Sequence, residues 1–457
     1  MHTFVDPLQR SCAIVPDAVA AVSGGESFTY AEFGRRCHTL AGALSRLGLQ
    51  AGDRVAIVAA NSHQYLEAYL AVPAAGLVIV PLNARHTDAE LEYCLRDAGV
   101  RVLLTDRDPG QLRSAVEHVI SVPEAYEDLL RESQPADLGA GVTEQSLAGL
   151  FYTGGTTGAS KGVMLSHRNL IANTFHVLAG LRLSSDDVWL VAAPMFHAAG
   201  TVAALGMVWV GGRQVLLPAW DAGQALDLIA QERVTVTLVV PTMLAALADE
   251  QLARPRDVRT LRMLSHGGSP VATETLRRAK AAFPDVEMVH VYGATETAPV
   301  ATFLFHEERH VDSALARSCG QPALGVDVRV VDVDGSPTPR GTVGEVVVRG
   351  PNVMLGYWHK PQETAAALDN GWYRTGDLGH MDETSHLFLV DRAKDMIVTG
   401  GENVYSTEVE DVLYAHPAVL EAASRLDIGI LWLPTDAPWT TPIEKLWLRL
   451  KQEPPPP

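Results

Sequence analysis

The feature that most constrains the fold is an alternation of short apolar runs with amphipathic segments in the first quarter of the chain. Apolar runs at Val55–Val58, Leu77–Pro81 and Val100–Leu104 predict strands, and the segments between them predict helices. The second helix begins with Thr87-Asp-Ala-Glu90, a capping box that satisfies exposed amide groups. Strands that alternate with helices predict a parallel sheet covered on both faces.

The same alternation returns after residue 188. Strands are expected near Val188–Ala193, Gln214–Leu217, Thr235–Val240, Met263–Leu264 and Met288–Tyr292. Amphipathic segments such as Ala225–Glu232 and Thr273–Phe283 predict the helices between them. After about residue 320, alternating valines and turn residues predict hairpins. We therefore expect an α/β fold with two doubly wound αβαβα-type subdomains and a small β-rich subdomain.

Composition and net charge limit the kinds of partner that this chain is expected to bind. The 457 residues exceed one ordinary core, and a net charge of -18 argues against a nucleic-acid or anionic-membrane partner. The four cysteines have no metal-ligand spacing, which favours free thiols in a reducing compartment. No signal peptide is visible, and the longest apolar run, residues 68–82, is too short to span a bilayer. We expect a cytoplasmic protein without an integral membrane segment.

The stretch Phe151-Tyr-Thr-Gly-Gly-Thr-Thr-Gly-Ala-Ser-Lys-Gly162 combines flexible backbone, hydroxyl groups and one cation. Glycines let amide groups crowd around an anion, and Lys161 adds a positive charge, so the stretch predicts a polyphosphate loop. It is neither a Walker loop nor a dinucleotide fingerprint, because its glycine and lysine spacing differs from both. The alternative is a flexible surface loop without a ligand.

Other candidate residues follow predicted strands, where ligands bind in open α/β sheets. Tyr292-Gly-Ala-Thr-Glu296 offers an aromatic ring, a hydroxyl group and a carboxylate that could hold Mg²⁺, or it is a helix start capped by Thr295. The pair Gly267-Gly268 permits close approach of a flat ligand, or forms an ordinary turn. His197 is a lone imidazole, and Asp377 is expected in a tight turn where it could accept ribose hydroxyls or only form the turn.

Together these motifs resemble the adenylate-forming superfamily of AMP-binding acyl-CoA synthetases. The order of motifs is the phosphate loop, Phe196-His197, Gly267-Gly268, Tyr292–Glu296, Arg374-Thr-Gly-Asp377 and Asp391-Arg-Ala-Lys-Asp395. The resemblance covers roughly residues 10–423. It implies that a carboxylic acid attacks the α-phosphate of ATP to give an acyl-adenylate, from which CoA thiol displaces AMP.

The resemblance also implies a role for each matching residue. Glu296 would bind Mg²⁺, Thr295 the α-phosphate, and His197 would lie beside the acyl carboxylate as a gate. The phosphates of ATP would be held by Thr153, Gly154, Gly155, Thr156, Thr157, Gly158 and Lys161. Tyr292 would stack on adenine, and Gly267 and Gly268 would line the adenine and acyl pockets. Asp377 and Arg392 would hold the ribose. Lys394 matches the hinge of the C-terminal lid. His197 stands where amino-acid-activating relatives have Asp, which favours a plain carboxylic acid.

The family pattern ends at residue 423. We expect an AMP-binding domain over residues 1–392, with its β-rich part at about 315–392, a remnant of a truncated α+β lid at 393–423 and a foreign tail at 424–457. No Gly-Lys pair follows Gly401, whereas relatives carry a lid lysine that meets the acyl carboxylate. The tail resembles the C-terminal end of a DDE-type transposase, with Glu444 at the last carboxylate position; the alternative is a diverged lid.

We hypothesise that a mobile element interrupted the gene. The tail carries four basic and four acidic residues, so it has no excess charge for DNA. The expected function is a carboxylic acid–CoA ligase for a fatty or related acid, using ATP, Mg²⁺ and CoA, with adenylation impaired by loss of the lid lysine. The alternative is an inactive ATP- and acyl-binding remnant. The surface that a short lid leaves uncovered favours self-association as a homodimer.

Overall fold

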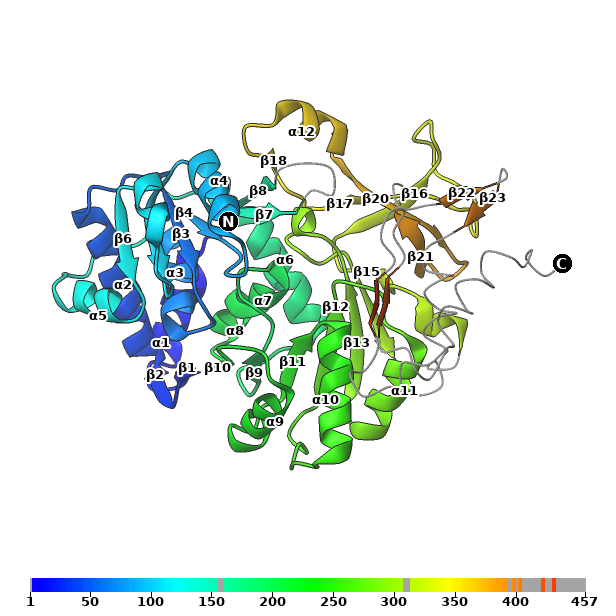
Figure 1. Cartoon of the computed structure of the whole chain (residues 1–457), viewed down its shortest axis with the longest axis horizontal. Coiled ribbons are helices and arrows are strands. Elements are labelled where there is room, and N and C mark those ends of the chain that lie inside the picture. The colour runs from blue at the N-terminus through cyan, green and yellow to red at the C-terminus, as the bar shows by residue number, and fades with distance from the viewer. Residues whose placement is uncertain are drawn as a thin grey trace. The chain divides into compact units, whose positions relative to one another are not determined.

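The computed structural model describes residues 2–154, 160–306, 313–392, 397–399, 402–404, 421–423 and 430–432 (Figure 1). The chain divides into two compact units, residues 1–389 and 390–457. The boundary lies inside strand β21 (Leu387–Arg392).

The first unit contains a seven-stranded sheet in the order β18-β8-β7-β4-β3-β5-β6. Its strands are β3 (Arg54–Val58), β4 (Val78–Pro81), β5 (Val100–Thr105), β6 (His118–Ser121), β7 (Leu147–Thr153), β8 (Lys161–Ser166) and β18 (Gly356–Tyr357). Strands β4, β3, β5, β6 and β7 are parallel to their neighbours, while β8 forms an antiparallel hairpin with β7. The expected β-α-β-α-β order is confirmed, including the capping box of Thr87 and Glu90 at the start of α4 (Asp88–Ala98).

A nine-stranded sheet follows the order β15-β14-β13-β12-β11-β9-β10-β1-β2. Its strands are β1 (Val19–Ser23), β2 (Glu26–Thr29), β9 (Val188–Val191), β10 (Arg213–Leu216), β11 (Val236–Val239), β12 (Met263–Gly267), β13 (Glu287–Tyr292), β14 (Thr302–His306) and β15 (Gln321–Pro322). All five strands expected after residue 188 are present. Strands β1 and β2 were not expected here, since they come from the N-terminus; β1 pairs with β10 across a long sequence separation, and β2 pairs with β1.

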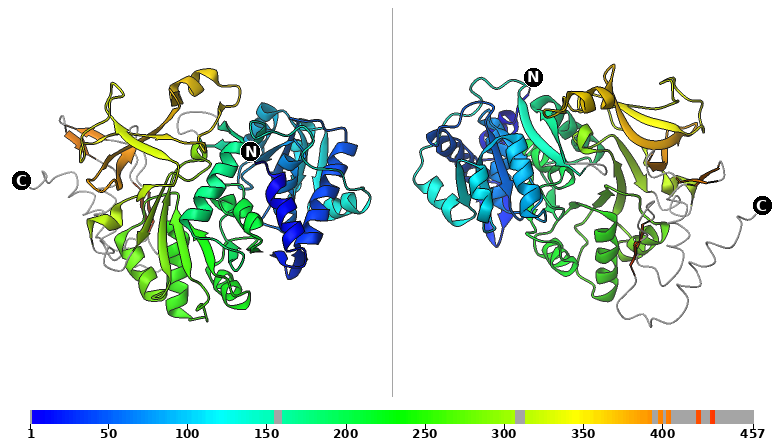
Figure 2. Two further views of the ribbon diagram at one scale, coloured as in Figure 1. Left: turned by 180° about the vertical axis from the view of Figure 1, so that it is seen from behind. Right: turned by 45° about the horizontal axis from the view of Figure 1, so that its top comes forward.

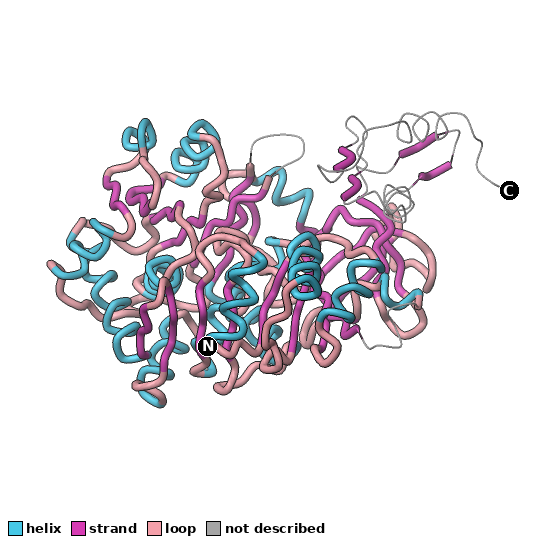
Figure 3. The backbone as a smooth tube through the Cα atoms, turned by 60° about the horizontal axis from the view of Figure 1, so that its bottom comes forward, coloured by secondary structure: helices cyan, strands magenta, loops and turns pink. Residues whose placement is uncertain are grey.

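Helices separate and cover these sheets (Figures 1, 2 and 3). They are α1 (Val5–Ile14), α2 (Tyr30–Arg46), α3 (His63–Ala74), α4, α5 (Glu124–Arg131), α6 (His167–Gly180), α7 (Ala198–Thr201), α8 (Ala204–Val210), α9 (Ala222–Gln231), α10 (Pro241–Ala253) and α11 (Thr273–Ala282). One buried cluster joins α2, α3, α6 and α8 to residues of both sheets. Two further clusters pack α4 on the seven-stranded sheet and α9, α10 and α11 on the nine-stranded sheet. The layers are therefore α, β, α, β and α, which confirms the expected fold class.

The β-rich part is a five-stranded sheet in the order β16-β17-β20-β19, with β21 paired to β20. Its strands are β16 (Asp327–Val331), β17 (Gly344–Arg349), β19 (Leu368–Asp369), β20 (Trp372–Met381) and β21. Helix α12 (Pro361–Ala367) and the 3₁₀ turns η1 (Gly110–Ala115), η2 (Thr295–Thr297) and η4 (Ala314–Arg317) complete the first unit. The hairpins expected after residue 320 are confirmed.

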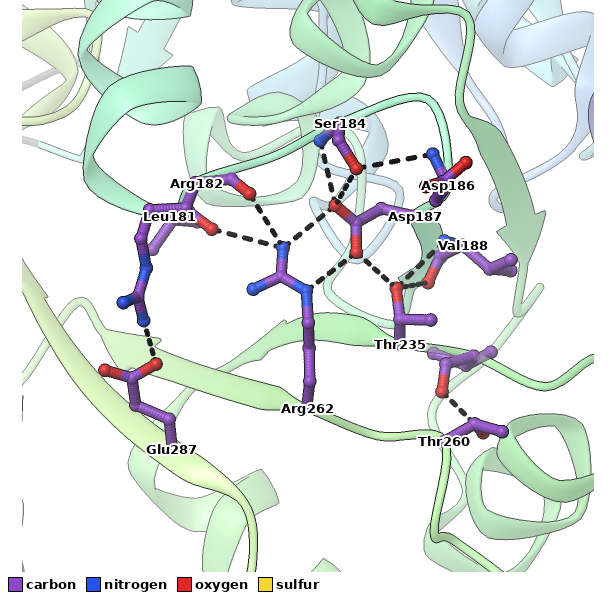
Figure 4. A network of polar contacts seen from close by, with 11 residues as sticks. Leu181, Arg182, Ser184, Asp186, Asp187, Val188, Thr235, Thr260, Arg262 and Glu287 are labelled. Atoms are coloured by element: carbon purple, nitrogen blue, oxygen red, sulfur yellow. Dashed lines mark hydrogen bonds and ion pairs between the residues drawn. The ribbon is translucent and has the colours of Figure 1, made fainter.

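An arginine–aspartate contact ties together the amino-terminal ends of the strands (Figure 4). Arg262 donates through Nε and Nη2 to both carboxylate oxygens of Asp187, at 2.8 and 2.9 Å. The Thr235 hydroxyl and the Ser184 amide donate to the same carboxylate. Burial raises the pKa of Asp187, but these hydrogen bonds outweigh it and lower the pKa overall. This contact holds together the amino-terminal ends of β9, β11 and β12. Ligand binding is predicted at the opposite, carboxyl ends of these strands.

Beyond the end of β21, the second unit is described only at two short hairpins. They pair β22 (Ile397–Thr399) with β23 (Glu402–Val404), and β24 (Glu421–Ala423) with β25 (Ile430–Trp432). The predicted hinge Lys394 and most of residues 424–457 lie outside the described residues. Among the helices of the described chain, none has the length and apolar character needed to cross a membrane.

Candidate functional site

The predicted phosphate loop connects β7 to β8. Thr153 and Lys161 face each other in register where the strands of this hairpin meet the connecting loop. Gly154 is exposed, whereas Gly155, Thr156, Thr157 and Gly158 lie outside the described residues, so their phosphate contacts stay predictions. The Lys161 ammonium lies 5.1 Å from the ring centroid of Tyr357, within range of a cation–π interaction.

Tyr357 links this hairpin to Glu296. Strand β18 pairs antiparallel with β8, and Tyr357 lies opposite Val163. Its hydroxyl group donates to Glu296 Oε1 at 2.8 Å, and both side chains are buried. Burial, followed by the Glu296 carboxylate, raises the pKa of Tyr357, so its hydroxyl stays protonated and available as a donor.

Glu296 lies in the 3₁₀ turn η2, directly after β13. The Met354 amide donates to the Glu296 carbonyl oxygen at 2.8 Å, which anchors this turn to the segment before β18. The alternative role of Thr295 as a cap is wrong, because the Thr297 hydroxyl accepts from the Ala294 amide at the start of the turn. Thr295 is half-buried and carries no such capping bond among the described contacts.

Tyr292 and Asp377 are in direct contact. The Tyr292 hydroxyl donates to Asp377 Oδ2 at 2.7 Å, and burial and this carboxylate together raise the pKa of Tyr292. The expectation of a tight turn at Asp377 is wrong, since it lies inside the continuous strand β20. A bulge opposite Val346 interrupts the pairing there, and Gly376 permits it with φ of 74°.

Tyr373 joins these two contacts. It lies on β20, hydrogen-bonds Tyr357, and has a pKa raised first by burial and then by Glu296 and its other neighbours. We call Tyr292, Glu296, Tyr357, Tyr373 and Asp377 the tyrosine–carboxylate cluster. It brings together residues from β13, η2, β18 and β20. The cluster thus holds two carboxylates near the carboxyl end of β13, where each accepts a hydrogen bond from a tyrosine hydroxyl.

The Gly267-Gly268 pair lies next to the cluster. Gly267 ends β12 and pairs with Val291, the residue before Tyr292. A Cβ atom at Gly267 would lie 2.1 Å from the Val291 carbonyl oxygen, so a larger residue cannot fit. Gly268 is exposed with φ of 88°, a left-handed conformation that favours glycine.

His197 lies apart from the cluster in the described contacts, at the start of α7. Desolvation of the imidazole, followed by the charges of Arg85 and His86, lowers its pKa. The turn that carries it is held by the buried Asn61, whose Oδ1 accepts from the Met195 amide at 2.8 Å. Asn61 Nδ2 also donates to the carbonyl oxygens of Val191, Ala193 and Leu217. Asn61 therefore ties the end of β3 to the ends of β9 and β10.

A small cavity of about 10 Å³ lies between the two segments that follow His197 and Glu296. Ala198 and Thr201 line one side, and Ala298 and Pro299 line another. The remaining wall is mostly apolar, with Tyr69, Asn173 and Thr174 as its polar members. The space holds one water-sized group, so a larger ligand requires movement of its walls.

The cluster fits a metal that a nucleotide carries. Mg²⁺ prefers oxygen ligands and usually binds one or two carboxylates together with phosphates. Glu296 supplies such an oxygen, and no group of three or more His, Cys, Asp or Glu side chains in the described residues forms a complete metal cage. A metal at Glu296 would therefore need further oxygen ligands from its substrate.

Comparison with known proteins assigns the chain to a family. Residues 8–358 match the family of AMP-binding enzymes. The chain belongs to this family. A feruloyl-CoA synthase from an Amycolatopsis species is 41% identical over 419 residues, which cover 90% of this chain and 82% of that protein.

Two solved structures of one enzyme, each with bound ligands, are similar to this chain. The o-succinylbenzoate-CoA synthetase of Bacillus subtilis, in complex with its acyl-adenylate intermediate, has a TM-score of 0.87 and 28% identity, covering 98% of this chain and 92% of that one. The same enzyme with ATP and magnesium has a TM-score of 0.83 and 29% identity, covering 93% and 88%. Structural neighbours of this chain thus bind ATP and Mg²⁺.

Sequence reasoning missed three residues of this site. Tyr357 follows Gly356, and Tyr373 directly precedes the motif Arg374–Asp377, which are usable signals. Asn61 follows a strand end and could have been selected on that position alone. The contacts of Arg392 remain a prediction, since its side chain is not described.

Proposed function

We propose that this chain is a carboxylic acid–CoA ligase that works through an acyl-adenylate. The observation that carries the proposal is the tyrosine–carboxylate cluster, which gathers the candidate residues Tyr292, Glu296 and Asp377 at one end of β13. Lys161 lies beside it on the ring of Tyr357. The family assignment and the nucleotide-bound neighbours support this function.

The chemistry needs positioning rather than a protein nucleophile. A carboxylate oxygen of the acid attacks the α-phosphorus of ATP, and pyrophosphate leaves. The CoA sulfur then attacks the acyl carbonyl carbon, and AMP leaves with the electron pair of the broken C–O bond. Bound Mg²⁺ would neutralise phosphate charge. Glu296 would hold that ion, Lys161 and Thr153 the phosphates, Thr295 the α-phosphate, and Asp377 the ribose.

The acid is proposed to be a plain carboxylic acid of the fatty or aromatic class. His197 would lie beside its carboxylate, with a lowered pKa that keeps the imidazole neutral near pH 7. The mostly apolar cavity lined by Ala198 and Ala298 holds only a water-sized group, so the walls would have to move for the far end of such an acid to bind there. The feruloyl-CoA synthase among the relatives supports an aromatic member.

A second proposal concerns the rate of adenylation. The sequence of residues 424–457 departs from the family pattern, and no Gly-Lys pair follows Gly401. Loss of one preorganised donor to a transition-state charge typically costs about 10²–10³ in rate. We infer that these 457 residues bind nucleotide but form acyl-adenylate slowly, with residues 393–423 acting as a lid remnant.

Exchange of labelled pyrophosphate into ATP tests both proposals. The acid panel comprises ferulate, indoleacetate, o-succinylbenzoate and fatty acids of several lengths. Exchange that depends on one acid, slow for a ligase and absent in Glu296→Ala, supports both. Exchange at the rate of an intact ligase contradicts the impairment. A chain that neither exchanges nor binds ATP contradicts the ligase assignment.

A further inference from the structure

We propose that Tyr357 is a positioning residue that prepares Glu296 for Mg²⁺ and keeps Lys161 apart from it. This inference rests on the proposed function, because it assumes that ATP and Mg²⁺ bind at this site. It adds a residue to which neither the sequence motifs nor the comparisons give a role. The hydroxyl group of Tyr357 contacts Glu296, and its aromatic ring contacts Lys161.

The hydroxyl group of Tyr357 orients the carboxylate. It donates to Glu296 Oε1 at 2.8 Å, and Oε1 is the only oxygen of this carboxylate with a hydrogen-bond donor among the described side chains. Oε2 is therefore left to bind a cation. Hydrogen bonds to a metal-binding carboxylate fix its orientation, and their removal typically lowers metal affinity about 10- to 100-fold.

The ring of Tyr357 holds the lysine. The Lys161 ammonium lies 5.1 Å from the ring centroid, and no ion pair joins Lys161 to Glu296 in the described structure. A direct Lys161–Glu296 ion pair would compete with Mg²⁺ for the carboxylate and with phosphate for the ammonium. By binding one group on its hydroxyl and the other on its ring face, Tyr357 keeps both available.

The backbone around Tyr357 makes this arrangement rigid. Tyr357 pairs with Val163 two residues from Lys161, and its amide donates to Thr364 Oγ1 at 2.9 Å. Tyr373 hydrogen-bonds it from β20. Tyr357 is thus held from three directions, which is what a positioning residue requires.

The test is the Mg²⁺ dependence of ATP binding, measured by calorimetry on the full chain without acid or CoA. We expect Tyr357→Phe to raise the Mg²⁺ concentration needed for tight ATP binding about 10- to 100-fold, because Phe keeps the ring for Lys161 but loses the hydroxyl. ATP affinity without Mg²⁺ should change less than about threefold. Tyr357→Leu removes ring and hydroxyl, so it should weaken ATP binding both with and without Mg²⁺.

Tyr126→Phe is the matched control. The Tyr126 hydroxyl donates to Glu67 Oε2 at 2.7 Å, a phenol–carboxylate bond between α5 and α3 that does not involve Glu296. This variant should keep the wild-type Mg²⁺ dependence. If Tyr357→Phe also keeps it while the wild type binds ATP with Mg²⁺, the inference is wrong. If the wild type binds no ATP at all, the proposed function itself fails.

Discussion

The Tyr292 hydroxyl donates a hydrogen bond of 2.7 Å to Asp377 Oδ2 and thereby connects the nine-stranded sheet to the β-rich sheet. Tyr292 ends β13, and Asp377 lies at the bulge of β20. The bond helps to orient the Asp377 carboxylate at the bulge. In the proposed function, Asp377 held in this way would accept hydrogen bonds from two ribose hydroxyls.

Removal of this carboxylate should weaken nucleotide binding. Asp377→Ala loses charge-assisted hydrogen bonds worth about 1.5–3 kcal/mol, so we expect AMP to bind about 10- to 100-fold more weakly. Tyr292→Phe keeps the ring and the carboxylate, so the loss should be below about tenfold. Calorimetric titration with AMP measures both. Wild-type affinity in Asp377→Ala would show that this residue does not hold the nucleotide.

Asn61 should stabilise the turn that carries His197. Asn61→Ala leaves the Met195 amide and three carbonyl oxygens without their side-chain partner. Buried polar groups that lose partners cost about 1–3 kcal/mol each, so we expect the free energy of unfolding to fall by about 2–4 kcal/mol, measured with urea. Asn83→Ala, at a half-buried turn where only the Arg85 amide loses a side-chain partner, should lower it by less than about 1.5 kcal/mol. Equal effects of the two substitutions would contradict the assignment.

The Asp187–Arg262 contact predicts a loss of stability without a loss of ligand binding. Asp187→Asn places an amide group among the donors Arg262, Thr235 and Ser184 (Figure 4). The expected loss is about 2–3 kcal/mol in the free energy of unfolding. Asp128→Asn breaks an exposed pair with Arg131 and should cost about 0–1 kcal/mol. Weakened ATP binding in the folded Asp187→Asn chain would be inconsistent with a purely structural role.

Buried histidines predict acid sensitivity. Burial lowers the pKa of His167, His176 and His290 to about 4, from an ordinary value of 6.5. His266 stacks on His290 at 5.0 Å between ring centroids, and burial and its neighbours lower its pKa as well. In the unfolded chain these groups take up protons below about pH 6.5, while the folded chain resists until about pH 4. Stability is therefore complete above pH 6.5 and falls between pH 6.5 and 4.

Thermal unfolding between pH 7 and 4.5 measures this effect. Each such histidine contributes on the order of 3 kcal/mol across the whole window. His176→Gln should reduce the fall in melting temperature, whereas His359→Asn, at an exposed position, should not change it. A melting temperature independent of pH over this range would disprove the explanation.

The elements were predictable where local patterns decide them. The capping box at Thr87 and Glu90 and the apolar run at Val100–Leu104 gave correct elements because short-range chemistry determines both. The pairing of β1 with β10 was not predictable, since it joins Ala21 to Gln214 and no local signal encodes such a distance. The position of Asp377 was misjudged because a glycine bulge inside a strand and a turn share the same residues.

Part of the candidate site could be predicted, because some of its residues are close together in the sequence. Tyr292 and Glu296 stand in one short motif at a strand end, so sequence alone selected them. Tyr357 becomes adjacent to Glu296 only because β18 adds to the seven-stranded sheet beside β8. That contact depends on tertiary structure across 61 residues, which sequence periodicity does not report.

The most direct measurement of the central claim is the affinity for a non-hydrolysable acyl-adenylate analogue, an acyl-sulfamoyl adenosine carrying the preferred acyl group. It needs no lid lysine and probes the nucleotide and acyl sites together. We expect the analogue to bind at least about 100-fold more tightly than AMP, as for an intermediate analogue, and we expect Asp377→Ala to lose that binding. An analogue that binds no tighter than AMP would contradict an acyl-adenylate site in this chain.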